Sequence, residues 1–245
     1  MASHNFVKMN ILHEDDHLIV VEKPAGLLTI PDRSGNPDNL YAKLQKQYGQ
    51  VFIVHRLDRE TSGVLCFART EAAHRNLSMQ FEHHTTDKFY HVLVDGQLHH
   101  EEGEINKPIG EHPGIPGKMA ILNSGKPSLT FYRALERFKR FTLVEALLKT
   151  GRTHQIRIHF QSIGYPLAVD ALYGQRPGLF LSEIKGKKYK SGKEVEAERP
   201  LLERVSLHAS RLRLDHPQTG ERMEFKSELP KDFAATLNQL RKWNG

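Results

Sequence analysis

The stretch His55-Arg56-Leu57-Asp58-Arg59-Glu60-Thr61-Ser62-Gly63 joins two short apolar segments, residues 51–54 and 64–67, that are typical of strands. It places one carboxylate, Asp58, between two arginines where a strand gives way to a loop. Opposite charges within ~4–6 Å keep an aspartate ionised, which suits a nucleophile or an electrostatic stabiliser. Structural ion pairs at a protein surface produce the same pattern, and the charges alone favour that second interpretation.

The rest of the chain divides into strands and helices that do not alternate regularly. Apolar alternation or short apolar runs predict strands over residues 10–13, 17–23, 51–54, 64–67, 88–95, 130–135, 142–149 and 207–214. Apolar residues at helical spacing, with polar residues before them, predict helices over 39–48 (capped by Asp38), 71–83 (capped by Thr70), 153–163 (capped by Thr153) and a final helix after Pro230. This irregular order favours an α+β class over a doubly wound parallel sheet.

Composition excludes several classes of protein. The chain has 245 residues with 35 Lys+Arg against 29 Asp+Glu, a net charge of +6, and 38% hydrophobic residues, which is enough for a sizeable core. The apolar runs are far shorter than the ~20 residues that cross a bilayer, and no apolar stretch near Met1 predicts a signal peptide. The single cysteine, Cys66, suits a reducing cytoplasm. The positive charge gives about even odds of a polyanionic partner.

Two further segments carry candidate functional groups. Residues 149–157, Lys-Thr-Gly-Arg-Thr-His-Gln-Ile-Arg, join a strand to a helix, and the free N–H groups of a helix start favour an anion such as phosphate or an aspartate. Lys88-Phe89-Tyr90 sets an aromatic residue beside a cation on a strand, where packing is the commoner role of such residues.

His13-Glu14-Asp15-Asp16-His17 matches the zinc motif H-E-x-x-H in sequence only. The motif needs a helix, because residues four apart then share one face. Both flanks here predict strands, and Glu-Asp-Asp is typical of a turn, so we expect a solvated hairpin. A zinc hydrolase that uses His13 and His17 is nevertheless kept as a rival hypothesis, which metal analysis of the protein would test.

Taken together, the segments resemble the RluA-type family of pseudouridine synthases. The resemblance covers residues 10–225 in family order, and it rests on Lys23-Pro24-Ala25-Gly26, His55–Gly63, Lys88-Phe89-Tyr90, Thr150–Arg157, Asp170, Tyr173-Gly174 and Leu207-His208-Ala209. One departure lies in residues 164–170, where Tyr165 and Val169 replace the family's His and Gly. The resemblance implies one α+β catalytic domain over residues 10–245, after a tail at 1–9, with a mixed, largely antiparallel sheet flanked by helices and loops.

The resemblance also implies a reaction and its residues. A uridine in RNA is isomerised to pseudouridine with neither a metal nor a cofactor. Asp58 is the catalytic aspartate, Tyr90 stacks on the flipped uracil, and Arg157 pairs with Asp58. Whether Asp58 attacks the ribose, attacks the base or assists glycal formation stays open. The expected RNA-binding and base-flipping residues are His55, Arg56, Arg59, Thr61, Arg152, His154 and Gln155, with Arg56 filling the space that the flipped base leaves.

The expected partner is an rRNA or tRNA stem-loop, and we expect a cytoplasmic monomer without a membrane partner or a small-molecule cofactor. No segment before residue 23 is long enough for an RNA-binding domain of the ribosomal-protein S4 type. Residues 175–200 are expected to form a surface insertion, and its lysines, Lys185, Lys187, Lys188 and Lys190, precede three glutamates, which favours a solvated loop. A non-catalytic RNA-binding protein on the same fold is the second rival, although a carboxylate near phosphates would weaken simple binding.

Overall fold

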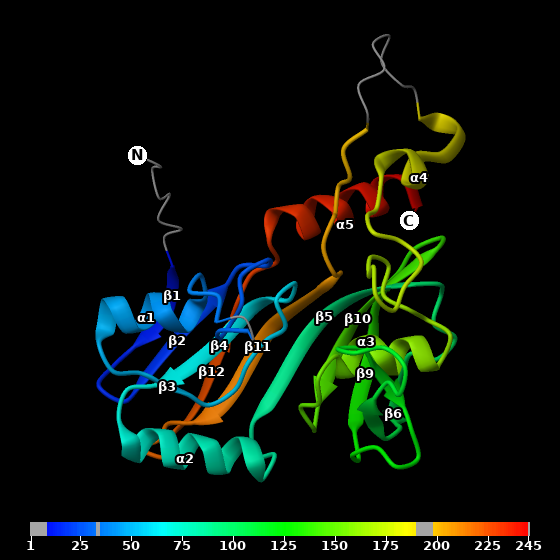
Figure 1. The fold of residues 1–245 in the computed structure, drawn as a ribbon. Helices are drawn as coiled ribbons and strands as arrows, with labels where there is room; N and C mark the ends of the chain where they lie inside the picture. Colours follow the sequence, from blue (N-terminus) through cyan, green and yellow to red (C-terminus); the bar gives the residue numbers. More distant parts are fainter. Residues whose placement is uncertain (1–8, 33–34, 190–197, 245) are drawn as a thin grey trace. The chain divides into compact units, whose positions relative to one another are not determined.

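The computed structural model describes residues 9–32, 35–189 and 198–244 (Figure 1). The chain divides into two compact units, which are described here separately. The first unit comprises residues up to Thr86 together with Arg211–Ser227, and the second comprises Asp87–Ser210 together with Glu228–Gly245. The strand β11 (Leu207–Asp215) contributes its first residues to the second unit and its last residues to the first.

The first unit combines strands with two helices. Its other elements are β1 (Asn10–Glu14), β2 (Leu18–Lys23), α1 (Leu40–Tyr48), β3 (Phe52–Ile53), β4 (Ser62–Ala68), α2 (Glu71–Glu82) and β12 (Arg222–Lys226). The strands β1, β2 and β4 lie side by side in that order, β3 pairs with β4, and β12 pairs with β11, all antiparallel. Every residue of β4 is buried, because apolar side chains cover both of its faces.

The turn between β1 and β2 is the segment that matches the zinc motif. The Asp15 carboxylate accepts the N–H groups of His17 and Leu18 at 2.7 and 2.8 Å, and it lies 2.6 Å from His13 Nε2. The two histidines thus flank a strand–turn–strand junction, as predicted, and lack the helical spacing that the motif requires.

The second unit is built on a long antiparallel hairpin. Its strands are β5 (Asp87–Asp95), β6 (Glu102–Asn106), β7 (Ile109–Glu111), β8 (Met119–Ile121), β9 (Leu129–Arg137) and β10 (Phe141–Leu148). Its helices are α3 (Gln155–Ser162), α4 (Leu181–Lys185), the short 3-10 helix η1 (Gly186–Lys188) and α5 (Lys231–Asn244). The order β11-β5-β10-β9-β6 forms its sheet, while β7 and β8 pair separately.

The core of the second unit holds α5 against the sheet. Phe233, Leu237 and Leu240 of α5 are fully buried and pack with Leu93 of β5 and Phe141 of β10. The expected insertion 175–200 contributes to the same core through Leu179 and Ile184. Its residues 190–197 lie outside the described part of the chain.

The structure confirms the predicted α+β class with a largely antiparallel sheet. For two helices, however, the first residues differ from the prediction. The side chain of Asn39, not Asp38, caps α1, because its Oδ1 accepts the N–H of Ala42 at 2.9 Å. The predicted cap Thr153 is also wrong, since α3 begins at Gln155 after His154, whose backbone is left-handed at φ 57°. Thr70 caps α2 as predicted. Among the described residues, no helix is long and apolar enough to cross a membrane.

The assignment of Asn39 as the cap of α1 can be tested directly. Asn39 is fully buried, and its amide also donates to the carbonyl of Asn36 at 2.9 Å. Asn39→Ala should lower the free energy of unfolding by about 1–2 kcal/mol, because the first turn of α1 loses its acceptor. Asp38→Ala is the matched control, and its exposed side chain should change stability by less than about 0.5 kcal/mol in urea titrations. Equal losses for both variants would contradict the assignment of Asn39 as the cap.

Candidate active site

Asp58 lies in the loop between β3 and β4 of the first unit, and its side chain is half-buried. Its neighbours Arg56 and Arg59 are exposed, whereas Leu57 is 6% exposed and anchors the loop in the interior. The Arg59 side chain turns back and donates from Nε to the carbonyl of Gly26 at 3.0 Å. The loop therefore presents one carboxylate between two cations, as the sequence predicts.

A buried lysine holds the backbone on the C-terminal side of Asp58. The side chain of Lys23 is fully buried at the end of β2, and its Nζ donates to the carbonyls of Pro24, Leu27 and Arg59 at 2.9, 2.7 and 3.0 Å. The carbonyl of Arg59 also accepts the N–H of Gly26 at 2.9 Å. Burying an ammonium is costly unless each of its protons is hydrogen-bonded, and here three carbonyls meet that need. Lys23 thereby ties residues 24–27 to the residue after Asp58.

A threonine holds the backbone on the other side. The hydroxyl of Thr29, which is 3% exposed, donates to the carbonyl of Leu57 at 2.8 Å and accepts the N–H of Leu57 at 3.2 Å. Thus two buried polar side chains from residues 23–29 fix the residues immediately before and after Asp58. The sequence resemblance includes Lys23 but assigns it no role, and no sequence pattern singles out Thr29. A lysine at the end of a strand of buried apolar residues was the one available signal.

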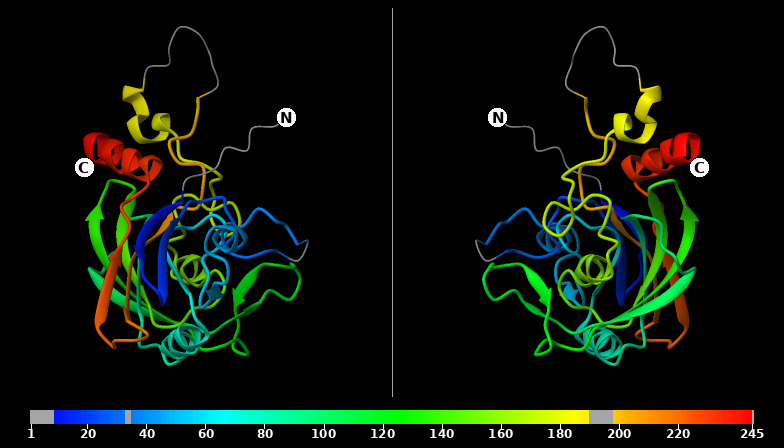
Figure 2. Two further views of the ribbon diagram at one scale, coloured as in Figure 1. Left: turned by 90° about the vertical axis from the view of Figure 1, so that its left-hand side faces the viewer. Right: turned by 90° about the vertical axis from the view of Figure 1, so that its right-hand side faces the viewer.

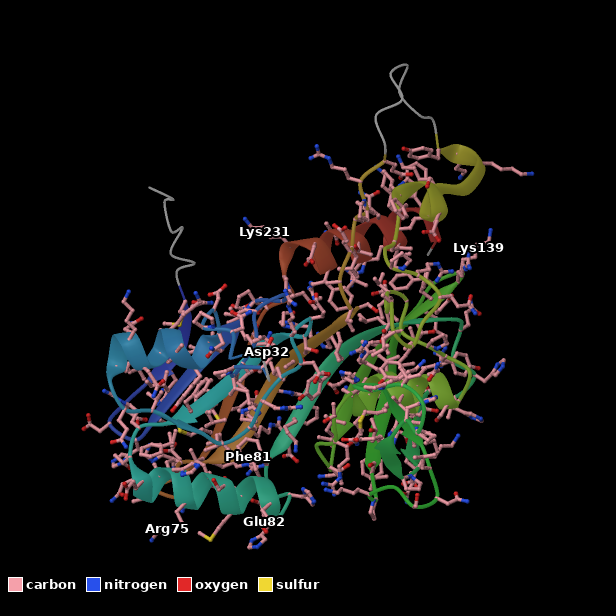
Figure 3. All side chains as sticks on the ribbon, viewed as in Figure 1. Asp32, Arg75, Phe81, Glu82, Lys139 and Lys231 are labelled. Carbon is pink, nitrogen blue, oxygen red and sulfur yellow. The ribbon has the colours of Figure 1, made fainter. Side chains whose placement is uncertain are left out.

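Two predicted RNA-binding residues of this loop have structural partners. The Nε2 atom of His55 accepts the N–H of Cys66 at 3.1 Å, and its ring stacks on Phe81, which projects from α2 (Figure 3), at 4.4 Å between centroids. Thr61 is 2% exposed, and its N–H donates to the carbonyl of Asp58. Both residues shape the loop, whereas Arg56 and Arg59 are its exposed cations.

In the second unit, Tyr90 and Lys88 lie two residues apart on β5 and so share one face of the strand. Tyr90 is 7% and Lys88 is 8% exposed. Burial, together with the nearby charge of Lys149, lowers the pKa of Lys88 to about 8, against a smaller opposing effect of Asp87. The face of β5 that carries Tyr90 therefore also carries a cation that burial disfavours.

Arg157 is held by a second carboxylate. It lies on the first turn of α3, its side chain is 8% exposed, and it donates from Nε and Nη2 to the two oxygens of Asp170 at 2.7 and 2.8 Å. Burial alone would raise the pKa of Asp170, but the bonds and charge of Arg157, with the N–H groups of Tyr173 and Leu172, lower it below its ordinary value. This bidentate geometry fixes the plane of the guanidinium.

Tyr173 and His154 extend this arrangement. The Tyr173 ring lies under the guanidinium of Arg157, with 4.8 Å from Cζ to the ring centre. Its phenol oxygen accepts the N–H of Met119 at 2.8 Å and lies 2.8 Å from Nδ1 of His154. His154 is one of two non-glycine residues among those described with positive φ, and this contact fixes its ring. His154, Tyr173, Arg157 and Asp170 thus form one connected group.

Gln155, one of the predicted RNA-binding residues, makes all of its side-chain hydrogen bonds inside the protein. It is 2% exposed, its Oε1 accepts from the Thr150 hydroxyl and the Arg152 N–H, and its Nε2 donates to the Leu129 carbonyl and the Thr130 hydroxyl, all within 3.0 Å. All four hydrogen-bonding positions of the amide are thus used inside the protein. Gln155 fastens the loop before α3 to β9, and Arg152 beside it remains half-exposed.

The structure thus gathers the predicted residues in two groups, His55–Thr61 in the first unit and Tyr90 with Arg152–Arg157 in the second. The pairing of Arg157 with Asp58 stays a prediction. Among the described residues, no three His, Cys, Asp or Glu side chains form a set that could hold a metal ion.

Comparison with known proteins links both groups to one family. A family model described as RNA pseudouridylate synthase matches residues 17–162. Two curated relatives are named ribosomal large subunit pseudouridine synthase D. The one from Nitrosomonas europaea is 39% identical over 96% of this chain and 66% of its own length, and the one from Pseudomonas aeruginosa is 38% identical over 96% and 72%. The solved structure of human RNA pseudouridylate synthase domain containing 4 has the same fold, with a TM-score of 0.70, 24% identity, and coverage of 95% of this chain and 93% of that one.

The contribution of Asp170 can be measured against a matched pair. Asp170→Asn should lower the free energy of unfolding by about 3–5 kcal/mol, because it leaves the buried Arg157 without its counter-charge. Asp232 makes a similar bidentate pair with Arg204, at 2.7 and 3.0 Å, but its side chain is 38% exposed. Asp232→Asn should therefore cost about 1 kcal/mol or less. If Asp170→Asn lowers the free energy of unfolding by no more than Asp232→Asn does, the Arg157–Asp170 pair does not stabilise the fold as proposed.

Lys88 should make stability depend on pH in a defined direction. Because its pKa falls from 10.5 to about 8 on folding, the unfolded chain binds more protons between these values, and stability rises with pH across that window. Lys88→Met removes the titrating group, so the unfolding free energy of the variant should no longer depend on this pKa. The difference between variant and wild type should therefore favour the variant most near pH 7. It should shrink by about 3 kcal/mol toward pH 10, at about 1.4 kcal/mol per pKa unit. Urea titrations at pH 7, 8.5 and 10 measure this difference, and a constant difference would refute it.

Proposed function

The chain belongs to the RNA pseudouridylate synthase family, and on that premise we propose that it isomerises specific uridines of RNA to pseudouridine with Asp58 as its catalytic aspartate. The reaction breaks the glycosidic N1–C1′ bond, turns the base and joins C5 to C1′. C5 loses its proton and N1 gains one, so that atoms and electrons balance without a redox partner. The residues must therefore bind a flipped nucleoside, stabilise the separated base and sugar, and move one proton.

The observation that carries this proposal is the rigid mounting of Asp58. Lys23 and Thr29 fix the backbone on both sides of a half-buried carboxylate. A reacting group that is already held in its reactive geometry does not lose conformational entropy to reach that geometry in each turnover. This fixed position is compatible with each of three roles for the carboxylate: attack on the ribose, attack on the base, or assistance to glycal formation.

Tyr90 and Arg157 supply the remaining proposed roles. The buried ring of Tyr90 offers a flat apolar face on which uracil stacks, and its phenol group is a candidate for removal of the C5 proton. Arg157 is proposed to pair with Asp58 through the part of its guanidinium that Asp170 does not engage.

We propose large-subunit rRNA as the substrate, because that is the RNA in the names of the relatives from Nitrosomonas and Pseudomonas. The net charge of +6 suits this polyanion. The exposed Arg56, two residues before Asp58, is proposed to fill the gap that the flipped uridine leaves in its stem. If pseudouridine maps of cells with and without the gene differ in tRNA instead, the substrate is a tRNA.

The charge of Asp58 should be essential for turnover and dispensable for binding. Asp58→Asn keeps the volume of the side chain and should reduce pseudouridine formation at least about 1,000-fold, because it removes a group that acts directly on the reacting atoms. RNA affinity should stay equal or rise, since a negative charge near phosphates is lost. The matched control is Asp16→Asn in the exposed turn before β2, which should retain full activity. Activity of the Asp58 variant within tenfold of the control would remove Asp58 from the mechanism.

A further inference from the structure

A second basic surface lies at the end of the second unit, where α4, η1 and α5 meet. Figures 1 and 2 show α4 and α5 side by side in every view, and buried Ile184 of α4 packs in the same cluster as Leu240 of α5. This packing brings the last turns of both helices together. The sequence predicted a solvated loop for Lys185, Lys187, Lys188 and Lys190. The structure places Lys185 on α4 and Lys187 and Lys188 on η1, and Lys190 lies outside the described residues.

Three lysines converge there on one aromatic ring. The Nζ atoms of Lys185, Lys242 and Lys188 lie 5.0, 5.4 and 5.8 Å from the centre of the Trp243 ring. Trp243 is half-buried, and its Nε1 donates to Gln239 at 3.2 Å, which fixes the ring on α5. We call Lys185, Lys188, Lys242 and Trp243 the Trp243 surface.

The positive charge of this surface is not neutralised within the described part of the chain. None of the three lysines forms an ion pair with any described residue. The two described acidic residues on or next to α4 have other partners, because Glu183 pairs with Arg176 at 3.0 Å and Glu198 accepts the N–H of Ser182 at 2.8 Å. Among the described residues, three ammonium groups therefore face one ring without a counter-charge.

Helix stability explains only part of this arrangement. Lysines near the C-terminal ends of α4 and α5 interact favourably with the helix dipoles, which accounts for Lys185 and Lys242. Lys188 ends η1, a single turn of three residues whose dipole is small, yet it approaches the same ring. Mutual repulsion of the three charges lowers stability, and a bound polyanion would relieve it.

We propose that the Trp243 surface is a second RNA contact, which binds the phosphodiester backbone of the substrate outside the target nucleotide. This inference rests on the proposed function for its partner. The core that carries α5 includes Leu93, which lies three residues, roughly 10 Å, beyond Tyr90 on β5 and therefore on the opposite face of that strand. Thus α5 packs on the side of β5 away from Tyr90, and the surface takes a segment of RNA that flanks the target nucleotide. Clustered lysines beside an aromatic ring match the cations and stacking faces that such segments use.

The test compares two double variants with equal loss of charge. Lys188→Gln/Lys242→Gln removes two lysines of the Trp243 surface, and Arg75→Gln/Lys226→Gln removes two exposed cations of the first unit, with Arg75 on the outer side of α2 (Figure 3). The affinity of each protein for a large-subunit rRNA transcript is measured across salt concentrations. Each lost phosphate contact lowers the slope of log K against log salt by about 0.7–0.9.

We expect the Lys188/Lys242 variant to lower the slope by about 1.5 and to weaken binding roughly tenfold near 0.1 M salt, with kcat at saturating RNA within twofold of wild type. The control variant should retain the wild-type slope. Equal slopes for the two double variants would overturn the inference and leave the surface to another partner. If wild type forms no pseudouridine while the slopes still differ, the RNA contact stands and the proposed reaction fails.

Discussion

The buried ammonium of Lys23 is the interaction on which the proposed site depends most. A charge without water must be hydrogen-bonded, and the carbonyls of residues 24, 27 and 59 meet this need around the Nζ atom of Lys23. That requirement couples the turn after β2 to the loop between β3 and β4. Thr29 adds a second link to the residue before Asp58. The position of the candidate catalytic carboxylate is therefore a consequence of satisfying buried polar groups elsewhere.

The second unit solves a similar problem in a different way. Arg157 is buried with a carboxylate that is 1% exposed, and the pair is completed by backbone N–H groups and by the Tyr173 ring. Because Asp170 neutralises Arg157, any further pairing with Asp58 would act through hydrogen-bond direction more than through net charge. Lys88, on the same face of β5 as Tyr90, is a cation whose pKa burial lowers to about 8, which makes the neighbourhood of Tyr90 sensitive to pH above neutrality.

Sequence patterns predicted eight of the twelve described strands and four of the five described α-helices, because periodicity and capping are local, but they did not predict β6, β7, β8, β12 or α4. They failed where a contact joins distant residues. The cap of α1 moved from Asp38 to Asn39, since the choice depends on which side chain faces the first turn. Gln155 was expected among the RNA-binding residues by resemblance alone, and the burial that directs its four hydrogen bonds into the protein has no local sequence signal. Thr29 leaves no periodic signal at all, and the lysines near Trp243 gained a common site only when α4 packed on α5.

The most direct test of the account follows the hydrogen that the reaction must remove. Transcripts of large-subunit rRNA and of tRNA are labelled with tritium at C5 of their uridines and incubated with the purified chain, and the tritium that reaches the water is counted. Formation of the C5–C1′ bond predicts release from a fixed, whole number of uridines in one of the two RNAs without added cofactor. Binding of both RNAs with no release of tritium from either would contradict the proposed isomerisation.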